Sequence, residues 1–312
     1  MVEDLSLSLS AGEMVGLVGE SGCGKTVTAL SIMRLIPEPP GRITGGRILF
    51  EGADLLSLPG DAMRDLRGNR IGMIFQEPMT SLNPVFTVGQ QIEEAVLLHR
   101  PVSRAQARKR AADLLDLVGI PAPAQALRRY PHQMSGGQRQ RVMIAIALAC
   151  EPKLLIADEP TTALDVTIQA QILDLIDGLR RDIGMAVLLI THDLGVVAEF
   201  CDRVAVMYAG RLVEEAPVQE LFARPAHRYT NALLATIPAA NPAGRPLPVI
   251  AGTVPPPGNR SSGCPFGPRC DAPVPACETV LPSVTAGQHR HRCWNPRSGL
   301  PAPDEAGRST GR

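Results

Sequence analysis

The chain of 312 residues has few aromatic side chains, no net charge and no long apolar run. Phe, Tyr and Trp make up only 3% of the residues, so the sequence predicts an aliphatic core. Lys and Arg together number 31, as do Asp and Glu, which argues against a dedicated nucleic-acid or polybasic membrane surface. An apolar content of 45% is ordinary, and this length allows one large domain plus a smaller appendage.

The sequence also lacks membrane-spanning and secretory signals. The apolar stretches that begin at Val142 and Met185 are shorter than the roughly 18–20 residues that span a bilayer. The first residues, "MVEDLSLSLSAGE", carry acids where a signal peptide needs basic residues. We therefore expect a soluble protein that reaches a membrane only through partners, and clustered cysteines that are not primarily disulfides.

Strand and helix patterns alternate over the first 234 residues. Short apolar runs at 14–19, 153–158 and 186–190 predict buried strands of a mostly parallel sheet, and 47–51 predicts a strand of an antiparallel patch. Residues 24–36 predict a helix that Pro37 stops. The expected fold is α/β, with a mostly helical insertion at about 77–150.

Three further helices are predicted from the spacing of apolar residues. One runs from Ser103 as N-cap to Gly119, and another covers 138–149. The third lies between the two apolar strands and ends at Gly184. The predicted buried faces are Ala107, Ala111, Leu114, Leu115 and Val118 in the first helix, and Ile168, Ile172, Leu175, Ile176 and Leu179 in the third.

A phosphate-binding loop is predicted at "GESGCGKT", which matches G-x-x-x-x-G-K-[ST] between a strand and a helix. Backbone N–H groups and the helix N-terminus can surround a phosphate there. Lys25 would reach the β- and γ-phosphates, and Thr26 would coordinate Mg²⁺, whereas Cys23 is interpreted as filler. The loop comprises Gly19, Glu20, Ser21, Gly22, Cys23, Gly24, Lys25 and Thr26.

Two carboxylates follow the predicted strand "LLIAD". Asp158 would hold Mg²⁺ through water, and Glu159 could polarise the attacking water. Together with the loop they indicate a nucleoside triphosphatase.

Further motifs resemble those of the ATP-binding cassette (ABC) family. "MSGGQRQRVMIAIALA" at 134–149 is similar to its signature sequence, with a small-residue turn opening a helix. Gln76 resembles the Q-loop glutamine, Asp165 belongs to a D-loop-like "TALD", and His192 resembles the switch histidine. The resemblance implies a P-loop nucleotide-binding domain with a RecA-like core, an antiparallel β subdomain and a helical insertion.

The resemblance implies a two-chain mechanism in which each ATP lies between one chain's loop and the other's signature turn. Glu159 would act as base, His192 would stabilise the γ-phosphate and attacking water, and Gln76 would sense nucleotide and Mg²⁺. The implied contacts to the partner's γ-phosphate come from Ser135, Gly136, Gly137 and Gln138, with Asp165 nearby. An isolated chain should hydrolyse ATP poorly.

A narrower resemblance covers nearly the whole chain. "QEPMTSLNPVFTVGQQI" from Gln76 and "GCPFGPRCDAPVPACETVLPSV" from Gly263 resemble ATPases of oligopeptide, dipeptide and nickel importers, which usually have Asp where Glu77 stands. The implied partners are a second ATPase, two permeases and, indirectly, a substrate-binding protein, which places the chain peripherally on the cytoplasmic face of the membrane. The solute would be a peptide, or alternatively nickel or another small solute.

The composition and the resemblance together predict four parts in the chain. We expect an ATPase domain at 1–234, a Pro/Gly-rich linker at 235–263, a cysteine-rich extension at 264–297 and a flexible tail at 298–312. Residues 237–263 contain seven prolines and four glycines. Family members also have an N-terminal strand whose aromatic residue stacks on adenine. No aromatic residue precedes Phe50, so we expect that strand to be missing.

The cysteines of the extension carry a second chemistry. Cys264, Cys270, Cys277 and Cys293 are spaced C-x5-C-x6-C-x15-C, unlike the C-x2-C pairs of common zinc modules. Four thiolates suit Zn²⁺ or an iron–sulfur cluster, and the resemblance favours [4Fe–4S]. A site that includes histidine, or reduced thiols that only pack, are the alternatives. His289 and His291 are interpreted as exposed loop residues, and Cys150 and Cys201 as core residues.

Two other function classes are less consistent with the sequence. A soluble ABC ATPase of DNA repair or translation would carry a long coiled coil or two cassettes, and neither pattern is present. A redox or interaction protein with a vestigial ATPase would have lost Lys25, Glu159 or Ser135, and the chain keeps all three.

Overall fold

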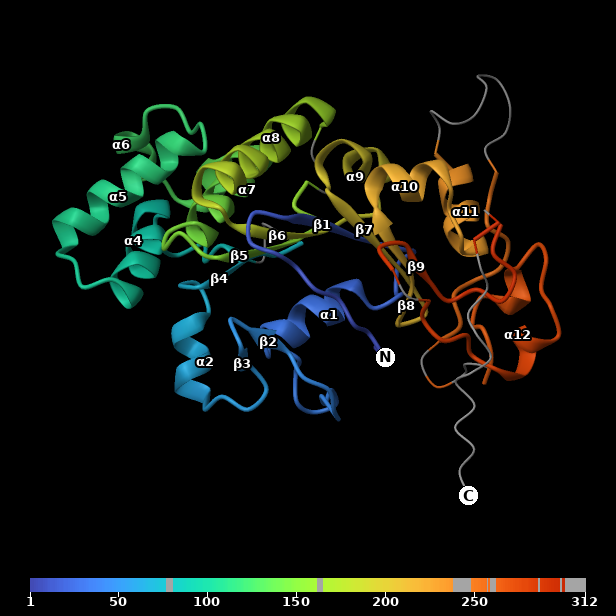
Figure 1. The fold of residues 1–312 in the computed structure, drawn as a ribbon. Helices are drawn as coiled ribbons and strands as arrows, with labels where there is room; N and C mark the ends of the chain where they lie inside the picture. Colours follow the sequence, from blue (N-terminus) through green and yellow to red (C-terminus); the bar gives the residue numbers. More distant parts are fainter. Residues whose placement is uncertain are drawn as a thin grey trace. The chain divides into compact units, whose positions relative to one another are not determined.

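A computed structural model gives the structure of the chain (Figure 1). It describes residues 1–76, 81–161, 165–237, 248–256, 258, 262–285, 287–297 and 299–300. The chain forms two compact units. The first comprises Met1–Ser8, Met14–Thr28 and Ile190–Arg312, and the second comprises Leu9–Glu13 and Ala29–Leu189.

The first unit contains four neighbouring strands, in the order β1 (Met14–Val18), β7 (Arg203–Tyr208), β8 (Arg211–Pro217) and β9 (Arg290–His291). β1 and β7 are parallel, whereas β7–β8 and β8–β9 are antiparallel. His291 of β9 stands opposite Glu214 of β8. The cysteine-rich region therefore contributes a strand to the sheet of this unit.

Short helices accompany these strands. They are α9 (Leu194–Phe200), α10 (Val218–Ala223), α11 (Arg228–Ala235), η3 (Gly267–Arg269) and α12 (Ala276–Thr279). Asp193 caps α9 by accepting hydrogen bonds from the backbone N–H groups of Gly195 and Val196. A Cβ on Gly16 of β1 would lie 3.1 Å from the Val197 side chain, so α9 packs closely on this strand.

The core of the first unit is not purely aliphatic, which corrects the expectation from composition. Tyr208, Tyr229 and Phe266 are among the largest fully buried side chains. The Tyr208 and Tyr229 ring centroids are 4.6 Å apart, and each lies 5.3 Å from the Phe266 centroid. Three of the ten aromatic residues thus meet where β7, α11 and the C-terminal region (residues 248–300) come together.

The second unit contains the strands β4 (Ile71–Ile74), β5 (Leu154–Asp158) and β6 (Ala186–Ile190), in that order, with β6 ending at the unit boundary. β4 and β5 are parallel, and all residues of β4 and β6 are buried. The predicted parallel, covered sheet is confirmed. β2 (Leu49–Phe50) and β3 (Ala53–Asp54) form the predicted antiparallel patch as a short hairpin, and α2 (Gly60–Leu66) follows it.

Helices dominate the segment between β4 and β5. They are α4 (Val88–His99), α5 (Arg104–Leu117), α6 (Pro123–Ala126), η1 (Pro131–Gln133) and α7 (Gly136–Ala147). Thr87, Ser103 and Ser135 each start a helix with a capping box that a glutamine completes. The predicted buried face of α5 is confirmed, because Ala107, Ala111, Leu114, Leu115 and Val118 are buried.

The helix between β5 and β6 is α8 (Val166–Ile183), which Gly184 ends in the left-handed conformation as predicted. Its buried face differs from the prediction. Ile172, Leu173 and Ile176 are buried, whereas Leu175 and Leu179 are partly exposed. Asp177 and Arg180 take positions on the buried face, where an ion pair of 2.8 Å compensates both charges.

The first helix, α1 (Lys25–Ile32), is shorter than the predicted 24–36. Arg34 adopts a left-handed conformation with φ of 49°, and the N–H of Leu35 donates to the carbonyl of Leu30. This 6→1 bond is the Schellman pattern that ends helices. The Arg34 guanidinium donates to the carbonyls of Leu55 and Leu58, which stabilises a conformation that non-glycine residues rarely adopt.

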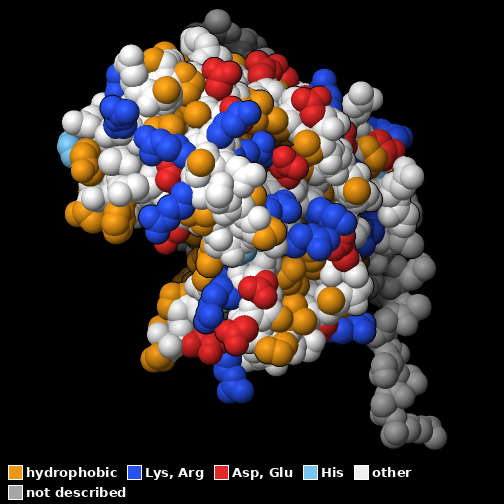
Figure 2. Space-filling model, turned by 90° about the vertical axis from the view of Figure 1, so that its left-hand side faces the viewer, with side chains coloured by type: hydrophobic (Ala, Val, Ile, Leu, Met, Phe, Trp, Pro, Cys, Tyr) orange, Lys and Arg blue, Asp and Glu red, His pale blue; other side chains and the backbone are white. Residues whose placement is uncertain are grey.

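The surface agrees with the balanced composition. On the face of the described residues that Figure 2 shows, Lys and Arg side chains alternate with acidic and apolar ones and form no patch of a single sign. Among the helices of the described part of the chain, none combines the length and apolarity that a membrane-crossing segment requires.

Candidate nucleotide site and cysteine pocket

The predicted phosphate-binding loop lies between β1 and α1, as the motif requires. Gly19 has φ of +151°, and a Cβ there would lie 2.2 Å from the carbonyl oxygen of Met207. Gly24 has φ of +109°. Glycine is therefore needed at Gly19 because of the neighbouring strand β7, and at Gly24 because of the backbone conformation.

Lys25 is folded over this loop. Its Nζ donates to the carbonyls of Gly19 at 2.7 Å and Glu20 at 3.2 Å, and the residue is only 7% exposed. The ammonium group is thus directed to the inside of the loop that the motif assigns to phosphate, while Thr26 at the start of α1 is exposed.

The turn between β7 and β8 forms a backbone hydrogen bond with the phosphate-binding loop. The N–H of Gly210 donates to the carbonyl of Cys23 at 2.7 Å. Cys23 is 1% exposed, and burial raises the pKa of its thiol. A buried, protonated thiol is consistent with the interpretation of Cys23 as packing.

Two predicted residues of the second unit are in direct contact. The amide of Gln76, just after β4, donates to the Glu159 carboxylate at 3.1 Å, just after β5. This contact follows from the topology, because the carboxyl ends of neighbouring parallel strands share one edge of a sheet. Asp158, the last residue of β5, is 1% exposed.

Glu159 has an unusual backbone. Its φ is +47°, in the left-handed region that few non-glycine residues occupy. Such strained residues are concentrated at functional sites. The conformation turns the chain immediately after β5 and supports a functional interpretation of Glu159.

The signature motif forms the start of α7, two residues earlier than predicted. The Ser135 hydroxyl accepts from the N–H of Gln138, and the Gln138 side chain accepts from the N–H of Ser135. A Cβ on Gly137 would lie 3.2 Å from the Ile168 side chain in α8, whereas Gly136 faces open space. The Gln138 side-chain oxygen is therefore engaged in capping, and Asp165 caps α8 by accepting from the N–H of Ile168.

The structure distributes the predicted nucleotide residues between the units. The loop at 19–26 and the exposed His192 belong to the first, and Gln76, Asp158, Glu159, Asp165 and 135–138 to the second. Residues 162–164 of "TALD" and Glu77 lie outside the described residues. The individual catalytic and binding roles stay predictions.

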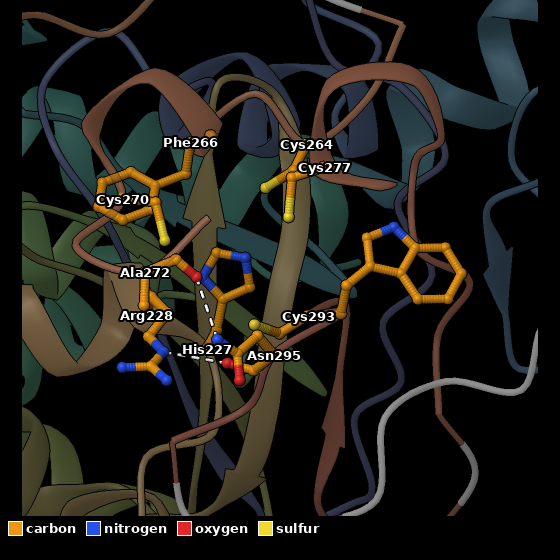
Figure 3. A pocket seen from close by; sticks show the side chains of 11 residues that line it. His227, Arg228, Cys264, Phe266, Cys270, Ala272, Cys277, Cys293 and Asn295 are labelled. Atoms are coloured by element: carbon orange, nitrogen blue, oxygen red, sulfur yellow. Dashed lines mark hydrogen bonds between the residues drawn. The ribbon is translucent and has the colours of Figure 1, made fainter. Parts of the chain in front are cut away.

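The four cysteines of the C-terminal region line one pocket (Figure 3). They are Cys264, Cys270, Cys277 and Cys293, and their sulfur atoms point towards a common space. The N–H of Cys264 donates to the carbonyl of Cys277 at 2.8 Å, which holds two of them together. The Asn295 backbone carbonyl accepts from Arg228 at 3.0 Å, and the Asn295 amide donates to the carbonyl of Ala272 at 3.1 Å, fixing the chain after Cys293.

Burial shifts the pKa values of side chains that line this pocket. It raises the pKa of Cys264 to about 12 and also raises the pKa values of Cys270 and Cys293. His227 lines the same pocket, and burial lowers its pKa to about 4, so its imidazole is neutral at pH 7. Its Nδ1 accepts from the N–H of Tyr229, whereas its buried Nε2 has no hydrogen-bond partner within the described structure.

In the part of the chain that the structure describes, no three His, Cys, Asp or Glu residues are arranged to hold a single metal ion. The interpretation of His289 and His291 as exposed loop residues is wrong. His291 is 2% exposed within β9, and His289 forms a 2.7 Å contact with the buried carboxylate of Glu214. Cys150 and Cys201 are buried, as predicted.

Sequence reasoning missed two residues that contact the phosphate-binding loop. The N–H of Glu20 donates to the Tyr229 hydroxyl at 2.9 Å, and Arg269 donates to both carboxylate oxygens of Glu20 at 3.0 and 3.1 Å. No local motif marks either residue. Only the scarcity of aromatic residues could have drawn attention to Tyr229. The chain has ten Phe, Tyr and Trp residues, and Tyr229 and its two aromatic neighbours are three of them.

Three features together define an ATP-binding cassette. They are a phosphate site between a strand and a helix, a carboxylate pair at the end of the buried strand β5, and a capped helix that begins with "SGGQ". The comparisons agree. Residues 2–162 match the ABC transporter family, and residues 213–277 match the C-terminal region of oligopeptide/dipeptide transporters. The chain belongs to the ABC transporter ATPase family, whose members work with membrane permease subunits.

Relatives of known name are similar over most of the chain. The chain is 56% identical over 294 residues to a probable peptide ABC transporter ATP-binding protein, y4tR, of Sinorhizobium fredii, covering 93% of this chain and 88% of the relative. It is 51% identical over 295 residues to the dipeptide transport ATP-binding protein DppD of Bacillus subtilis, covering 94% and 88%.

Solved structures show the same cassette fold. The ATP-binding cassette MJ0796, in a dimeric post-hydrolysis state bound to ADP and Pi, superposes with a TM-score of 0.63 at 30% identity, covering 70% of this chain and 90% of that one. The cbiO1 subunit from Clostridium perfringens superposes with a TM-score of 0.61 at 28% identity, covering 71% and 84%.

Proposed function

We propose that this chain is the ATP-hydrolysing subunit that energises uptake of oligopeptides or dipeptides through membrane permeases. The supporting observation is that one chain combines an ABC ATPase region at 2–162 with an oligopeptide/dipeptide transporter region at 213–277. Relatives at about half identity carry peptide-transport names. An importer of nickel or another small solute is the alternative, since other subunits choose the solute.

The proposed roles follow the geometry of each unit. Lys25 and the loop at 19–26 bind the ATP phosphates, and Thr26, Asp158 and Gln76 hold Mg²⁺ directly or through water. Glu159 acts as the base, and its contact with Gln76 connects the base to the residue that senses Mg²⁺. His192 stabilises the γ-phosphate and the attacking water.

The second half of each site is proposed to come from another chain. Ser135, Gly136, Gly137 and Gln138 would bind the partner's γ-phosphate through the N-terminus of α7, where backbone N–H groups and the helix dipole favour an anion. Asp165 caps α8, and the Ile168 side chain of that helix lies next to Gly137 of this turn. The partner is a second ATPase, two permeases complete the transporter, and the assembly places this chain on the cytoplasmic face of the membrane.

The cysteine pocket is proposed to hold a [4Fe–4S] cluster. The donor set fits such a group because four thiols converge on one pocket, which His227 also lines with a buried Nε2 that lacks a hydrogen-bond partner within the described structure. Cys264, Cys270, Cys277 and Cys293 would hold the cluster, with one thiolate for each iron atom. When bound it would supply a structural clamp or an electron store.

The function is tested with Glu159→Gln in the assembled transporter in proteoliposomes. We expect ATP binding to persist, while hydrolysis and uptake of labelled dipeptides fall by about 100-fold or more, the usual size of a general-base effect. Glu199→Gln, an exposed residue of α9, is the matched control and should behave as the wild type. Unchanged hydrolysis in Glu159→Gln would refute the base, and nickel uptake without peptide uptake would favour the alternative.

The cluster is tested on full-length protein purified without oxygen. Four irons with matching acid-labile sulfide and a broad visible absorption support it, and loss of both in Cys277→Ser but not in Cys201→Ala assigns the ligands. One zinc per chain and no iron would replace the cluster with the zinc alternative. Seven free thiols per chain and no bound metal would mean that the four cysteines of the pocket only pack.

A further inference from the structure

The C-terminal region contacts the phosphate-binding loop at a single acidic residue. Glu20 is the second residue of the loop, and its carboxylate accepts two hydrogen bonds from Nη1 of Arg269, at 3.0 and 3.1 Å. Arg269 lies between Cys264 and Cys270 in sequence, 249 positions after Glu20. The contact therefore joins the site of nucleotide binding to the loop that carries the cysteines.

The Arg269 side chain is fixed from several directions. Its side chain is only 6% exposed. Nε donates to the carbonyl of Ala251 at 2.7 Å, Nη2 donates to the carbonyl of Ile250 at 3.0 Å, and Nη1 also donates to the Tyr208 hydroxyl at 3.1 Å. Such a buried, fully engaged guanidinium is a rigid partner rather than a surface ion pair.

Aromatic rings complete this setting. The Arg269 guanidinium lies 5.7 Å from the Tyr208 ring centroid and 5.9 Å from that of Phe266, which is within the range of cation–π attraction. Tyr229 packs on both rings, and its hydroxyl accepts the N–H of Glu20. The backbone and the side chain of Glu20 are thus both held by residues beyond position 207.

The charge of Glu20 makes this contact relevant to nucleotide binding. A carboxylate within a loop that receives a triphosphate repels the ligand, and like charges brought together in a partly desolvated site are strongly unfavourable. Arg269 neutralises this carboxylate and fixes its direction.

We propose that Arg269 is a positioning residue for ATP, which acts by holding and neutralising Glu20 of the phosphate-binding loop. ATP affinity then depends on the described C-terminal segments at 248–256 and 262–285, although neither belongs to the phosphate motif. The proposal rests on ATP binding at this loop and concerns what sets its strength.

The test measures the ATP dissociation constant of the full-length chain by calorimetry, and KM and kcat for ATP in the assembled transporter. In Arg269→Gln, the uncompensated Glu20 should weaken ATP binding by about tenfold or more and raise KM more than it lowers kcat. The double variant Glu20→Gln/Arg269→Gln removes both charges and should recover most of the lost affinity. A merely structural role of Arg269 would not be rescued in this way.

Arg290→Gln is the matched control, because Arg290 lies in the same C-terminal region but pairs with Glu215 of β8. It should leave ATP affinity unchanged. Wild-type affinity in Arg269→Gln, or a double variant as weak as Arg269→Gln, would overturn the proposal while leaving the ATPase function intact. Absence of ATP binding in the wild type would instead contradict the proposed function.

Discussion

At the scale of single residues, the position of the Lys25 ammonium group is set by the loop that contains it. The short chain between β1 and α1 directs its ammonium group back to the carbonyls of Gly19 and Glu20. These carbonyls hold the amine in the loop until a phosphate competes for it. A lysine with this placement contributes through a charge-assisted hydrogen bond rather than through packing.

We expect Lys25→Met to weaken ATP binding by roughly 10- to 100-fold, because a hydrogen bond to a charged group contributes about 1.5–3 kcal/mol. Calorimetric titration with MgATP measures the change. Lys109→Met, at an exposed position of α5, is the control and should bind ATP as the wild type does. Equal affinity of the two variants would contradict the assignment of the loop.

The residues of the candidate site differ in how far the sequence predicted them. The loop, Asp158, Glu159 and Ser135 could be predicted as site residues because each belongs to a short motif whose spacing is set by one local turn. The contact between Gln76 and Glu159 required the sheet order, which places β4 beside β5. Arg269 could not be found, because its partner Glu20 is 249 positions away and an arginine beside a cysteine has many ordinary explanations.

At the scale of elements, those with strong local signals were predicted, and the others were missed. α5 was predicted nearly to its ends because Ser103, its apolar face and Gly119 are all local signals. The strands β7 and β8 were not predicted, and β9 is too short to give a pattern, although it extends the sheet. Pairing between such strands depends on contacts distant in sequence, which single-sequence patterns do not contain.

Glu214 of β8 is the polar centre where β8, α11 and the C-terminal region meet. Its carboxylate accepts from the N–H groups of Ala226 and His227, at 2.7 and 2.8 Å, and contacts His289. Burial disfavours its charge, but the hydrogen bonds from His289 and from the two backbone groups outweigh burial and lower its pKa.

We expect Glu214→Gln to lower the free energy of unfolding by about 1–3 kcal/mol, because the amide leaves buried donors unpaired. Chemical denaturation measures this change, with Glu220→Gln in α10 as a near-neutral control, because Glu220 is partly exposed and its surface pair with Arg224 contributes little. Since the folded pKa is depressed, the carboxylate stabilises the fold above its ordinary pKa near 4.5, and this stability is lost as pH falls through the folded value. Glu214→Gln should lose that part of the acid sensitivity, and an unchanged profile would contradict the assignment.

Gly263 shows how closely the cysteine loop is packed. A Cβ at this position would lie 2.1 Å from the carbonyl oxygen of Cys277, the group that accepts the Cys264 N–H. At Gly267 in the same loop, the corresponding Cβ would lie 3.6 Å from that oxygen, an ordinary contact. The two glycines therefore form a matched pair for substitution.

We expect Gly263→Ala to separate Cys264 from Cys277 and to destabilise the C-terminal region by about 1–3 kcal/mol, the usual penalty of overpacking. Gly267→Ala should be tolerated. Trp294 lines the cysteine pocket and is the single tryptophan of the chain, so its fluorescence during denaturation reports on this region. Identical transitions for the two variants would contradict the described packing.

At the scale of the whole molecule, the chain carries no net charge and has few aromatic residues. The described face in Figure 2 has no patch of a single sign, and three of the ten aromatic residues, Tyr208, Tyr229 and Phe266, are buried in the first unit. ATP binding by the loop and γ-phosphate binding by the signature turn are proposed to act on different nucleotides, one of which belongs to a partner chain.

Two helices that begin with the same serine cap allow these two functions to be separated. Ser135 and Ser103 each cap a helix and form a capping box with a glutamine three residues later. Substitution by Arg removes a cap worth about 1 kcal/mol in either case. Only Ser135→Arg also places a large side chain where the partner's γ-phosphate is expected.

In a Glu159→Gln background, Ser135→Arg should bind ATP as tightly as Ser103→Arg but fail to associate with the partner ATPase in sedimentation velocity with ATP. In the transporter with Glu159 intact, Ser135→Arg should lower hydrolysis by about 100-fold, as loss of a positioned oxyanion donor does. ATP-dependent association equal to that of Ser103→Arg would show that the signature turn of this chain does not bind the partner's nucleotide.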